Sequence, residues 1–418
     1  MNRPSPAALF ALAVATRIAY LLICRPPLES AYLALADGLV RDRVLGFDGV
    51  PSTSFEPLYP AFLAAGRLLF GDRTLMIQIM QTGIAALGAV LTYHLALRLT
   101  SSRLTAAAAG VMFAVHPLLI RQAAEATDLA LASILILWFA VAFVSIRDMR
   151  DAMAAGMWLG LTVLTRSMTL PILLLAAIIL MARRQQREAI ALTATTALLV
   201  APMVMRNYAL GGSPWAARSG INLYIGNSPY TAALLPTYDL DLLEPEAYER
   251  FVRARPEIAP DDPRMAAEFD AFLTRQALTF MAAHPWATIR QKVANVAYTL
   301  SPRIAPYVVS GPATRVVIQD DEVVGVEGAV PRNPAEILAH ALTAIVLLVG
   351  AARGVYLRRH TLFSRDAILW AIFVTFVIVN AAYVPATRYM APVQFVLMFY
   401  SAVAVARLRE GSAHAAVA

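Results

Sequence analysis

Long apolar stretches separated by short, arginine-bearing connections dominate the pattern of this chain. A stretch of about 20 apolar residues is long enough to cross the hydrocarbon core of a bilayer as a helix. Ten such windows lie at residues 7–24, 75–97, 104–120, 129–146, 152–166, 168–182, 188–206, 336–356, 366–383 and 389–407. The pattern therefore predicts an all-α polytopic membrane protein with about ten transmembrane helices.

The pattern changes between the seventh and eighth windows, and this change divides the chain into regions 1–206, 207–335 and 336–418. The middle region begins with an acidic, proline-rich part that is typical of loops and short helices. Residues 265–299 have apolar positions at helical spacing, interrupted at His284-Pro285, which predicts one or two amphipathic helices at the membrane interface. Residues 316–324 predict a small hairpin around an acidic turn. We expect an external α(+β) loop domain here.

Arginines at the ends of the windows predict the orientation in the membrane. They fall in alternate short connections, which the positive-inside bias assigns to the cytoplasm. They are Arg98, Arg103, Arg147, Arg150, Arg183, Arg184, Arg187, Arg353, Arg358, Arg359, Arg365, Arg407 and Arg409. Both termini are then cytoplasmic, and the loops that hold Glu29 and Asp128 face outward with the 207–335 region.

Composition supports the membrane assignment and narrows the partners. Of the 418 residues, 59% are hydrophobic and 15% are charged, and the mean hydropathy is +0.61. A water-soluble protein of this composition would have too little polar surface to cover its apolar core. The net charge of +7 comes from scattered arginines, which favours anionic lipid headgroups and not nucleic acid. The single Cys24 excludes an intrachain disulfide framework. The N-terminus shows no small-residue cleavage site, so we expect the first window to remain as an anchor.

Two acids stand at external ends of apolar windows. Glu29 follows the first window, in Pro26-Pro27-Leu28-Glu29-Ser30-Ala31-Tyr32, where a carboxylate is well placed to act as a catalytic base. Asp128 follows Thr127 and opens the fourth window, and Glu125 lies three residues earlier, on the same helical face if that turn is wound. Each acid also fits a structural interpretation as a charge at a helix N-terminus, with Thr127 as the cap before Asp128.

Arginines near apolar windows are candidates for binding an anionic group. Arg388 lies in Thr387-Arg388-Tyr389-Met390-Ala391-Pro392, where the last external turn enters the final window. Arg166 interrupts the apolar sequence between the fifth and sixth windows, and an ionisable group there is a functional candidate by default. The alternative for Arg166 is an external turn whose side chain extends to the headgroups.

The start of the middle region holds further polar candidates. Arg206 ends the seventh window, and Asn222 and Asn227 follow in a segment for which we expect a strand at Asn222-Leu223-Tyr224 and a Gly226-Asn227 turn. Asparagine amides there are able to bind sugar hydroxyls or phosphate, although a tight turn without a ligand fits equally. Lys292, the only lysine, follows Trp286 on the predicted amphipathic helix, where a solvated surface role is the ordinary interpretation.

These motifs together resemble the GT-C glycosyltransferases, polytopic enzymes that take a sugar from a polyprenyl-phosphate carrier. The resemblance covers the acid of the first loop followed by Tyr32 and Ala36, the Pro57-Leu58-Tyr59-Pro60 motif, the Thr127-Asp128 pair, the Arg206-Asn207 pair and Arg388-Tyr389. Within this class, the chain is similar to glycosyltransferase family 39, which includes protein O-mannosyltransferases and lipid A aminoarabinose transferases. In that family the acid of the first loop is usually Asp, one methylene shorter than Glu29.

The resemblance implies a site and a reaction. It makes Glu29 and Asp128 catalytic, and it places Tyr32, Tyr59, Glu125, Arg166, Arg206, Asn222, Asn227, Lys292, Arg388 and Tyr389 in substrate binding. Glu29 would take a proton from an acceptor hydroxyl as a monosaccharide leaves polyprenyl phosphate with inversion, on the periplasmic face of the bacterial inner membrane. The acceptor would be an envelope lipid, glycan or protein.

Other functions and a metal ion stay open at the level of the sequence. The six histidines show no metal-ligand spacing, so no metal site is predicted, although carboxylates suit a divalent cation. An O-antigen polymerase or ligase is a close alternative. A secondary transporter or lipid-linked sugar flippase would more often show repeated halves, and a non-catalytic assembly factor would not need acids in both early loops.

Overall fold

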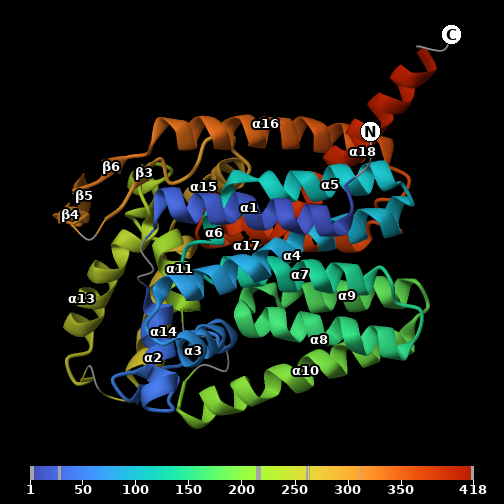
Figure 1. Ribbon diagram of the computed structural model, residues 1–418. Coiled ribbons are helices and arrows are strands. Elements are labelled where there is room, and N and C mark those ends of the chain that lie inside the picture. Colours follow the sequence, from blue (N-terminus) through green and yellow to red (C-terminus); the bar gives the residue numbers. More distant parts are fainter. Residues whose placement is uncertain are drawn as a thin grey trace.

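The computed structural model describes residues 4–26, 30–212, 218–259, 262, 264–311 and 313–415. The structure is built almost entirely of helices (Figure 1). Glu29 lies outside the described residues.

The described residues of the N-terminal half form ten helices. They are α1 (Pro6–Cys24), α2 (Ala31–Arg41), α3 (Leu58–Phe70), α4 (Thr74–Thr100), α5 (Arg103–Val115), α6 (Pro117–Gln122), α7 (Leu129–Phe143), α8 (Met149–Thr165), α9 (Pro171–Ala182) and α10 (Gln186–Ala209). The short strands β1 (Gly46–Phe47) and β2 (Val50–Pro51) pair between α2 and α3, and a 3-10 turn, η1 (Ser167–Thr169), joins α8 to α9.

The middle region is mixed and the C-terminal region is helical. The middle region contains α11 (Ser219–Gly226), α12 (Thr231–Leu234), η2 (Leu240–Leu243), α13 (Glu244–Ala254), α14 (Met265–Ala283), α15 (Pro285–Thr299), β3 (Val308–Val309), β4 (Arg315–Gln319), β5 (Glu322–Glu327) and β6 (Val330–Pro331). The chain ends with α16 (Pro334–Leu357), α17 (Ala367–Ala382), η3 (Thr387–Val393) and α18 (Gln394–Ala415).

Each predicted membrane window corresponds to a helix or a bent helix pair. Within the described residues, five helices are long and apolar enough to cross a bilayer, namely α1, α4, α10, α16 and the continuous η3–α18 segment. The bent pair α5 and α6 raises the number to six, and α7, α9 with η1, and α17 are shorter apolar helices. The chain is a multi-pass membrane protein, and the count of ten spans stays a prediction.

Capping residues set several helix boundaries. The Asp148 side chain accepts hydrogen bonds from the backbone N–H groups of Arg150 and Asp151 at 2.9 and 3.0 Å and begins α8. Asn333 does the same for α16 through the N–H of Ala335. Proline stands in the first turn of α6, α9 and α16, where its missing N–H has no helical partner to lose.

Small residues allow close packing between the membrane helices. A Cβ at Gly156 on α8 would lie 2.6 Å from the backbone oxygen of Leu192 on α10, so only glycine permits this approach. The Thr196 hydroxyl adds a 3.0 Å hydrogen bond across the same contact to the carbonyl of Gly156. Such contacts replace the hydrophobic driving force that helices lack inside lipid.

The middle region folds as predicted in two places and differently in a third. Helix α14 ends before His284 and α15 begins at Pro285, and β4 pairs with β5 as an antiparallel hairpin, so both predictions are confirmed. The predicted strand at Asn222-Leu223-Tyr224 is wrong, because these residues lie in α11. Ile221 and Ile225, four residues apart, bury one helical face against α14 and α13, and this packing favours the helix.

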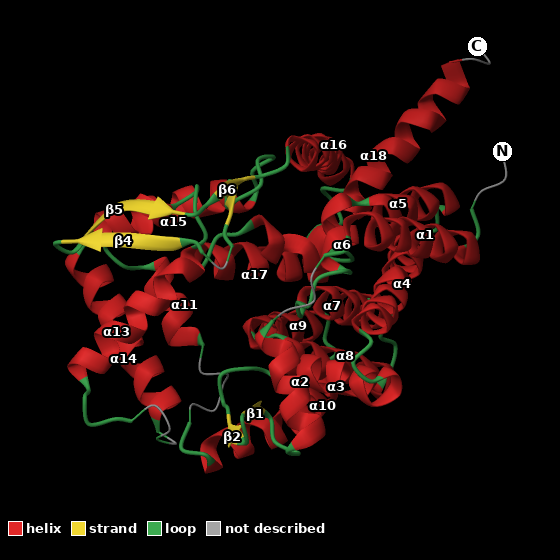
Figure 2. Ribbon diagram, turned by 60° about the vertical axis from the view of Figure 1, so that its left-hand side comes forward, coloured by secondary structure: helices red, strands yellow, loops and turns green. Residues whose placement is uncertain are grey.

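The middle region covers one end of the helix bundle. Helix α13 and the β4–β5 hairpin lie at this end, whereas α1 begins and α18 ends at the opposite end (Figures 1 and 2). Buried side chains form one large cluster in the bundle and smaller clusters in the middle region and around α2 and α3. Tyr389 packs on the middle-region cluster and Tyr32 on the α2–α3 cluster.

Candidate active site

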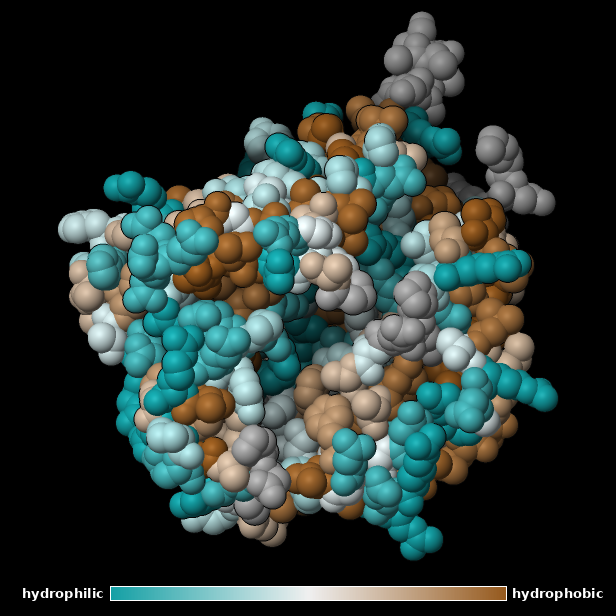
Figure 3. All heavy atoms as spheres, turned by 90° about the vertical axis from the view of Figure 1, so that its left-hand side faces the viewer, coloured by the Kyte–Doolittle hydropathy of each residue, from teal (hydrophilic) through white to brown (hydrophobic). Residues whose placement is uncertain are grey.

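A cavity of about 1950 Å³ is lined by both Tyr32 and Tyr389. Figure 3 shows the molecule hollowed on this face, with hydrophilic side chains gathered in and around the hollow. The charged side chains of its wall are the carboxylates Glu56, Glu125, Asp128, Asp241, Glu244 and Glu336 and the guanidinium groups Arg121, Arg166, Arg218, Arg332 and Arg388. Apolar side chains, including Ala19, Val115, Leu118, Ile120, Leu129, Leu170 and Val379, line other parts of the wall.

Seven predicted site residues line this cavity. They are Tyr32, Glu125, Asp128, Arg166, Asn222, Arg388 and Tyr389. They come from the first two predicted external loops, the α8–α9 connection, the middle region and the last turn. The fold therefore brings together residues that are more than 350 positions apart in sequence, from Tyr32 to Tyr389.

Asp128 and Arg166 form an ion pair in the cavity wall. One Nη1 of Arg166 donates to both carboxylate oxygens of Asp128, at 3.0 and 2.8 Å, and the two side chains are 15% and 7% exposed. Asp128 directly precedes α7, while Arg166 is the extended residue that ends α8. The alternative in which the Arg166 side chain extends to the lipid headgroups is therefore wrong, because this side chain turns into the protein.

Thr127 does not cap α7. Its hydroxyl donates to the Oε1 of Gln122 at 3.0 Å, and no side chain caps the first turn of this helix. Glu125 and Asp128 do not share a helical face either, because α6 ends at Gln122 and α7 begins at Leu129. The intervening residues form a loop, which separates the two carboxylates: Glu125 binds Arg121 at 2.6 Å, whereas Asp128 binds Arg166.

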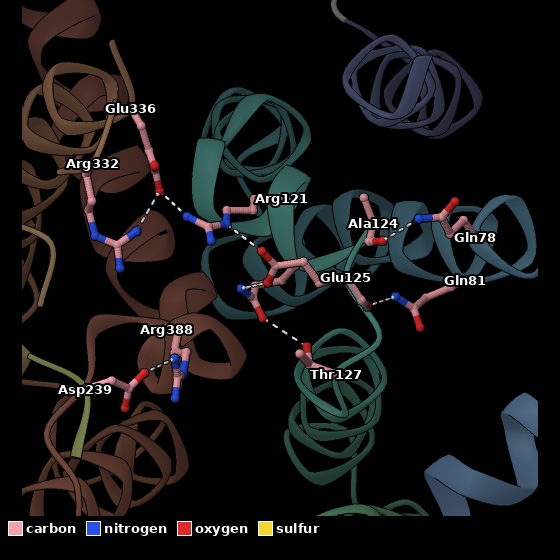
Figure 4. Close-up of polar contacts among 11 residues, drawn as sticks. Gln78, Gln81, Arg121, Ala124, Glu125, Thr127, Asp239, Arg332, Glu336 and Arg388 are labelled. Carbon is pink, nitrogen blue, oxygen red and sulfur yellow. Dashed lines mark hydrogen bonds and ion pairs between the residues drawn. The ribbon is translucent and has the colours of Figure 1, made fainter. Parts of the chain in front are cut away.

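Two glutamines of α4 hold the α6–α7 loop in place. Gln78 donates to the carbonyl of Ala124 at 3.0 Å, and Gln81 donates to the carbonyls of Ala123 and Glu125 at 3.0 and 2.6 Å (Figure 4). The Tyr59 hydroxyl donates to the Oε1 of Gln81 at 2.7 Å. Tyr59 is fully buried and outside the cavity wall, so its contacts orient Gln81 and give no support for direct substrate binding.

Glu56 is a half-buried acid of the cavity wall that the sequence interpretation missed. Its Oε1 accepts two hydrogen bonds from Ser167, from the backbone N–H at 2.8 Å and from the hydroxyl at 2.7 Å. Burial raises the pKa of the Glu56 carboxyl, and the bonds from Ser167 oppose this shift. The signal for Glu56 was an acid between Phe55 and Pro57, directly before the Pro-Leu-Tyr-Pro motif.

Tyr389 lies between two arginines. The guanidinium carbons of Arg166 and Arg388 lie 4.9 and 5.0 Å from the centre of its ring. Arg388 also donates to Asp239 at 2.8 Å and to Asp241 at 3.0 Å, both in or beside η2 of the middle region. The aromatic ring and the carboxylates therefore hold both cations at the cavity while balancing their charge.

Three predicted binding residues lie outside the cavity wall and bond to the backbone. Arg206 donates to the carbonyls of Ser52 and Leu45, and Asn227 donates to those of Leu223 and Ala382. Lys292 donates to the carbonyl of Gly226 at 2.9 Å, and burial lowers its pKa to about 8. These contacts join α10 to the first loop and the middle region to α17, so they support the fold around the cavity.

The prediction for Glu29 stays a prediction, since this residue lies outside the described part of the chain. Pro26 and Ala31, on either side of the undescribed residues, both line the cavity. Among the described residues, no group of three or more His, Cys, Asp or Glu side chains is arranged to hold a metal ion.

The class of protein follows from comparison of this fold with known structures. The archaeal oligosaccharyltransferase AglB from Archaeoglobus fulgidus, solved with an inhibitory peptide and a dolichol-phosphate, superimposes with a TM-score of 0.54 at 13% identity. The superposition covers 97% of this chain and 50% of AglB, so the chain spans half the length of that protein. The chain therefore shares the fold of AglB, which is the GT-C fold that the sequence predicted.

A protein-family model matches one part of the chain. Residues 51–206, from β2 to α10, match the model of dolichyl-phosphate-mannose-protein mannosyltransferases. ArnT from Cupriavidus metallidurans bound to undecaprenyl phosphate gives a TM-score of 0.40 at 13% identity, covering 97% of this chain and 78% of ArnT. No match was found among curated protein sequences.

Proposed function

We propose that this protein is a membrane glycosyltransferase that moves one monosaccharide from a polyprenyl-phosphate carrier to an envelope lipid, glycan or protein. The observation that carries the proposal is the cavity, where acids and arginines from distant parts of the chain share a wall with apolar side chains. Such a cavity suits a donor with a charged headgroup and an isoprenoid chain. The reaction takes place on the external face of the plasma membrane, which nucleotide sugars of the cytoplasm do not reach.

The reaction is a single displacement. A hydroxyl oxygen of the acceptor attacks the anomeric carbon, its proton passes to Glu29, and the bond from that carbon to the phosphate oxygen breaks. The phosphate leaves with the electron pair on the carrier lipid, and the configuration at the anomeric carbon inverts. General base catalysis of this kind contributes about 10²- to 10⁴-fold to the rate.

Asp128 and the two arginines around Tyr389 have supporting roles. Asp128 orients the acceptor through the carboxylate edge that faces the cavity, while Arg388 and Arg166 neutralise the departing phosphate. Both arginines already form ion pairs with carboxylates. The phosphate of the donor therefore has to displace a carboxylate or bind to the remaining donors of each guanidinium group. Arg206 is excluded from this role because it bonds to the backbone outside the cavity wall.

Envelope composition tests the proposal directly. Mass spectrometry of envelope lipids, glycans and proteins from cells with and without the gene should show one sugar missing from one acceptor in the deletion strain. The purified protein should then transfer that sugar from a polyprenyl-phosphate monosaccharide, and NMR of the product should show an inverted anomeric centre. Consumption of a lipid-linked polymer instead would identify a polymerase or ligase, and unchanged envelopes together with no transfer would overturn the proposal.

A further inference from the structure

Two arginines from separate elements converge on one carboxylate oxygen in the cavity wall. Arg121, on α6, and Arg332, between β6 and α16, both donate an Nη1 hydrogen to the Oε1 of Glu336, the contact from Arg332 measuring 3.2 Å. Figure 4 shows the two guanidinium groups reaching Glu336 from different sides. All three side chains line the cavity.

Each guanidinium group is held in place by a second partner that does not involve Glu336. The Nε of Arg121 donates to Glu125 at 2.6 Å, and the Nε of Arg332 donates to the carbonyl of Pro306 at 2.7 Å. Arg332 is only 8% exposed. Loss of Glu336 would therefore leave both groups pointing at the same place, which is the geometry of a preformed anion site.

The surroundings of this site fit a phosphate that carries a lipid chain. Helix α6 packs against both α1 and α16, and the cavity wall here includes Ala19, Val115 and Ala339, which reach the surface. Ile23 and Leu338, 81% and 60% exposed, continue an apolar surface outward on α1 and α16. The charged site therefore lies beside exposed apolar side chains of α1 and α16, two helices that are long and apolar enough to cross a bilayer, and such a surface suits a lipid chain.

A histidine that has one ring nitrogen without a partner lies one helical turn beyond Glu336. His340 lines the cavity and is 6% exposed, and its Nε2 has no hydrogen-bond partner. A buried polar atom without a partner is costly and indicates a missing ligand.

We propose that Arg121 and Arg332 bind the phosphate of the carrier lipid, whose chain passes between α1 and α16, and that the Glu336 carboxylate occupies this site when the carrier is absent. The proposal rests on the proposed function and specifies where its donor binds. Arg388 lines the same cavity, where it helps to neutralise the phosphate as the phosphate departs. Binding requires the phosphate to displace one carboxylate, so Glu336 competes with the carrier.

Binding of farnesyl phosphate tests the proposal without any sugar transfer. The full chain in phosphatidylcholine nanodiscs is titrated calorimetrically with farnesyl phosphate, with farnesol and with inorganic phosphate. We expect Arg121→Gln and Arg332→Gln each to weaken farnesyl phosphate binding about tenfold, as for loss of a charge-assisted hydrogen bond. Glu336→Gln should tighten it about threefold, because the competing charge is gone. Arg315→Gln, which breaks an exposed ion pair on the β4–β5 hairpin, is the matched control and should bind like the wild type.

The predicted affinity changes have opposite signs, which separates an effect on binding from misfolding. A Glu336→Gln variant that binds more tightly than the wild type must be folded. Equal affinity in the wild type and both arginine variants, weaker binding by Glu336→Gln, or no binding by the wild type would each overturn the phosphate site. Farnesol or inorganic phosphate binding as tightly as farnesyl phosphate would also overturn it. If the variants behave as expected but no polyprenyl-phosphate sugar is ever consumed, the proposed function fails and the lipid phosphate site stands.

Discussion

Asp128 and Arg166, 38 residues apart in sequence, are joined by one guanidinium nitrogen that donates to both carboxylate oxygens. The pair fixes the start of α7 to the end of α8 at the cavity wall. Neither side chain is free to bind a substrate alone, so the chemistry of each depends on the other.

Replacing one residue of this pair should destabilise the protein more than replacing both. We expect Asp128→Asn or Arg166→Gln alone to lower the free energy of unfolding by about 3 to 5 kcal/mol, because each leaves a buried charge or polar group without its partner. The double variant should recover more than half of that loss. Unfolding of the three variants in detergent, followed by circular dichroism, gives the coupling energy. Additive effects would show that the two side chains are independent.

Glu29→Gln should abolish sugar transfer without unfolding the protein. The amide keeps the size of the side chain but does not accept the proton, so we expect the transfer rate to fall at least about 100-fold. Asp48→Asn is the matched control, because Asp48 lies in the same loop at a positive φ of 51° that asparagine also adopts, and its rate should stay near the wild-type value. The rates are measured with a polyprenyl-phosphate sugar once the envelope comparison has identified it. A Glu29→Gln protein that transfers sugar normally would remove Glu29 from catalysis.

Glu56→Gln should stabilise the protein in a pH-dependent way. Because burial raises the pKa of Glu56 above its usual 4.5, the folded state binds more protons than the unfolded state above that pH, and wild-type stability falls as the pH rises. The glutamine variant keeps an acceptor for Ser167 but does not ionise. Its melting temperature should exceed that of the wild type at pH 7, and the difference should shrink toward zero below pH 4.5. A difference that grows on acidification would contradict the expected pKa shift.

Lys292→Met should raise the melting temperature at neutral pH but not at alkaline pH. The pKa of Lys292 is lowered from 10.5 to about 8, so its burial destabilises the charged form below pH 8, and this effect disappears as the pH rises toward 10.5. The methionine variant should therefore melt above the wild type at pH 7 and lose this advantage at alkaline pH. Thermal unfolding of both proteins at pH 7, 9 and 10.5 measures the difference. A gain that does not change with pH would indicate a packing effect instead.

The local pattern of the sequence was enough to predict many elements. The break between α14 and α15 was readable at His284-Pro285, because proline cannot continue the preceding helix. The β4–β5 hairpin was readable from two apolar runs around the acidic pair Asp320 and Asp321, which both adopt positive φ in the turn. These signals come from residues close in sequence, so no tertiary contact was needed to find them.

Features that depend on contacts between distant segments were missed. Asn222-Leu223-Tyr224 was expected as a strand, but packing against α14 and α13 makes it part of a helix. Glu56 was overlooked because the residue that donates its hydrogen bonds, Ser167, is 111 residues away in sequence. Arg121 and Arg332 were not singled out either, since Arg121 reaches the carboxylate of Glu336 from 215 residues away, although Arg332 lies only four residues before it.

The sequence by itself determined that this chain enters a bilayer many times and which acids and arginines stand at the ends of its spans, because apolar length and charge position are local properties. Only the tertiary structure decided which carboxylate neutralises which guanidinium group and which of these pairs face the cavity. The reason is electrostatic: in a poorly solvated wall a charge is tolerated only beside its partner, and that partner is chosen by how the helices pack.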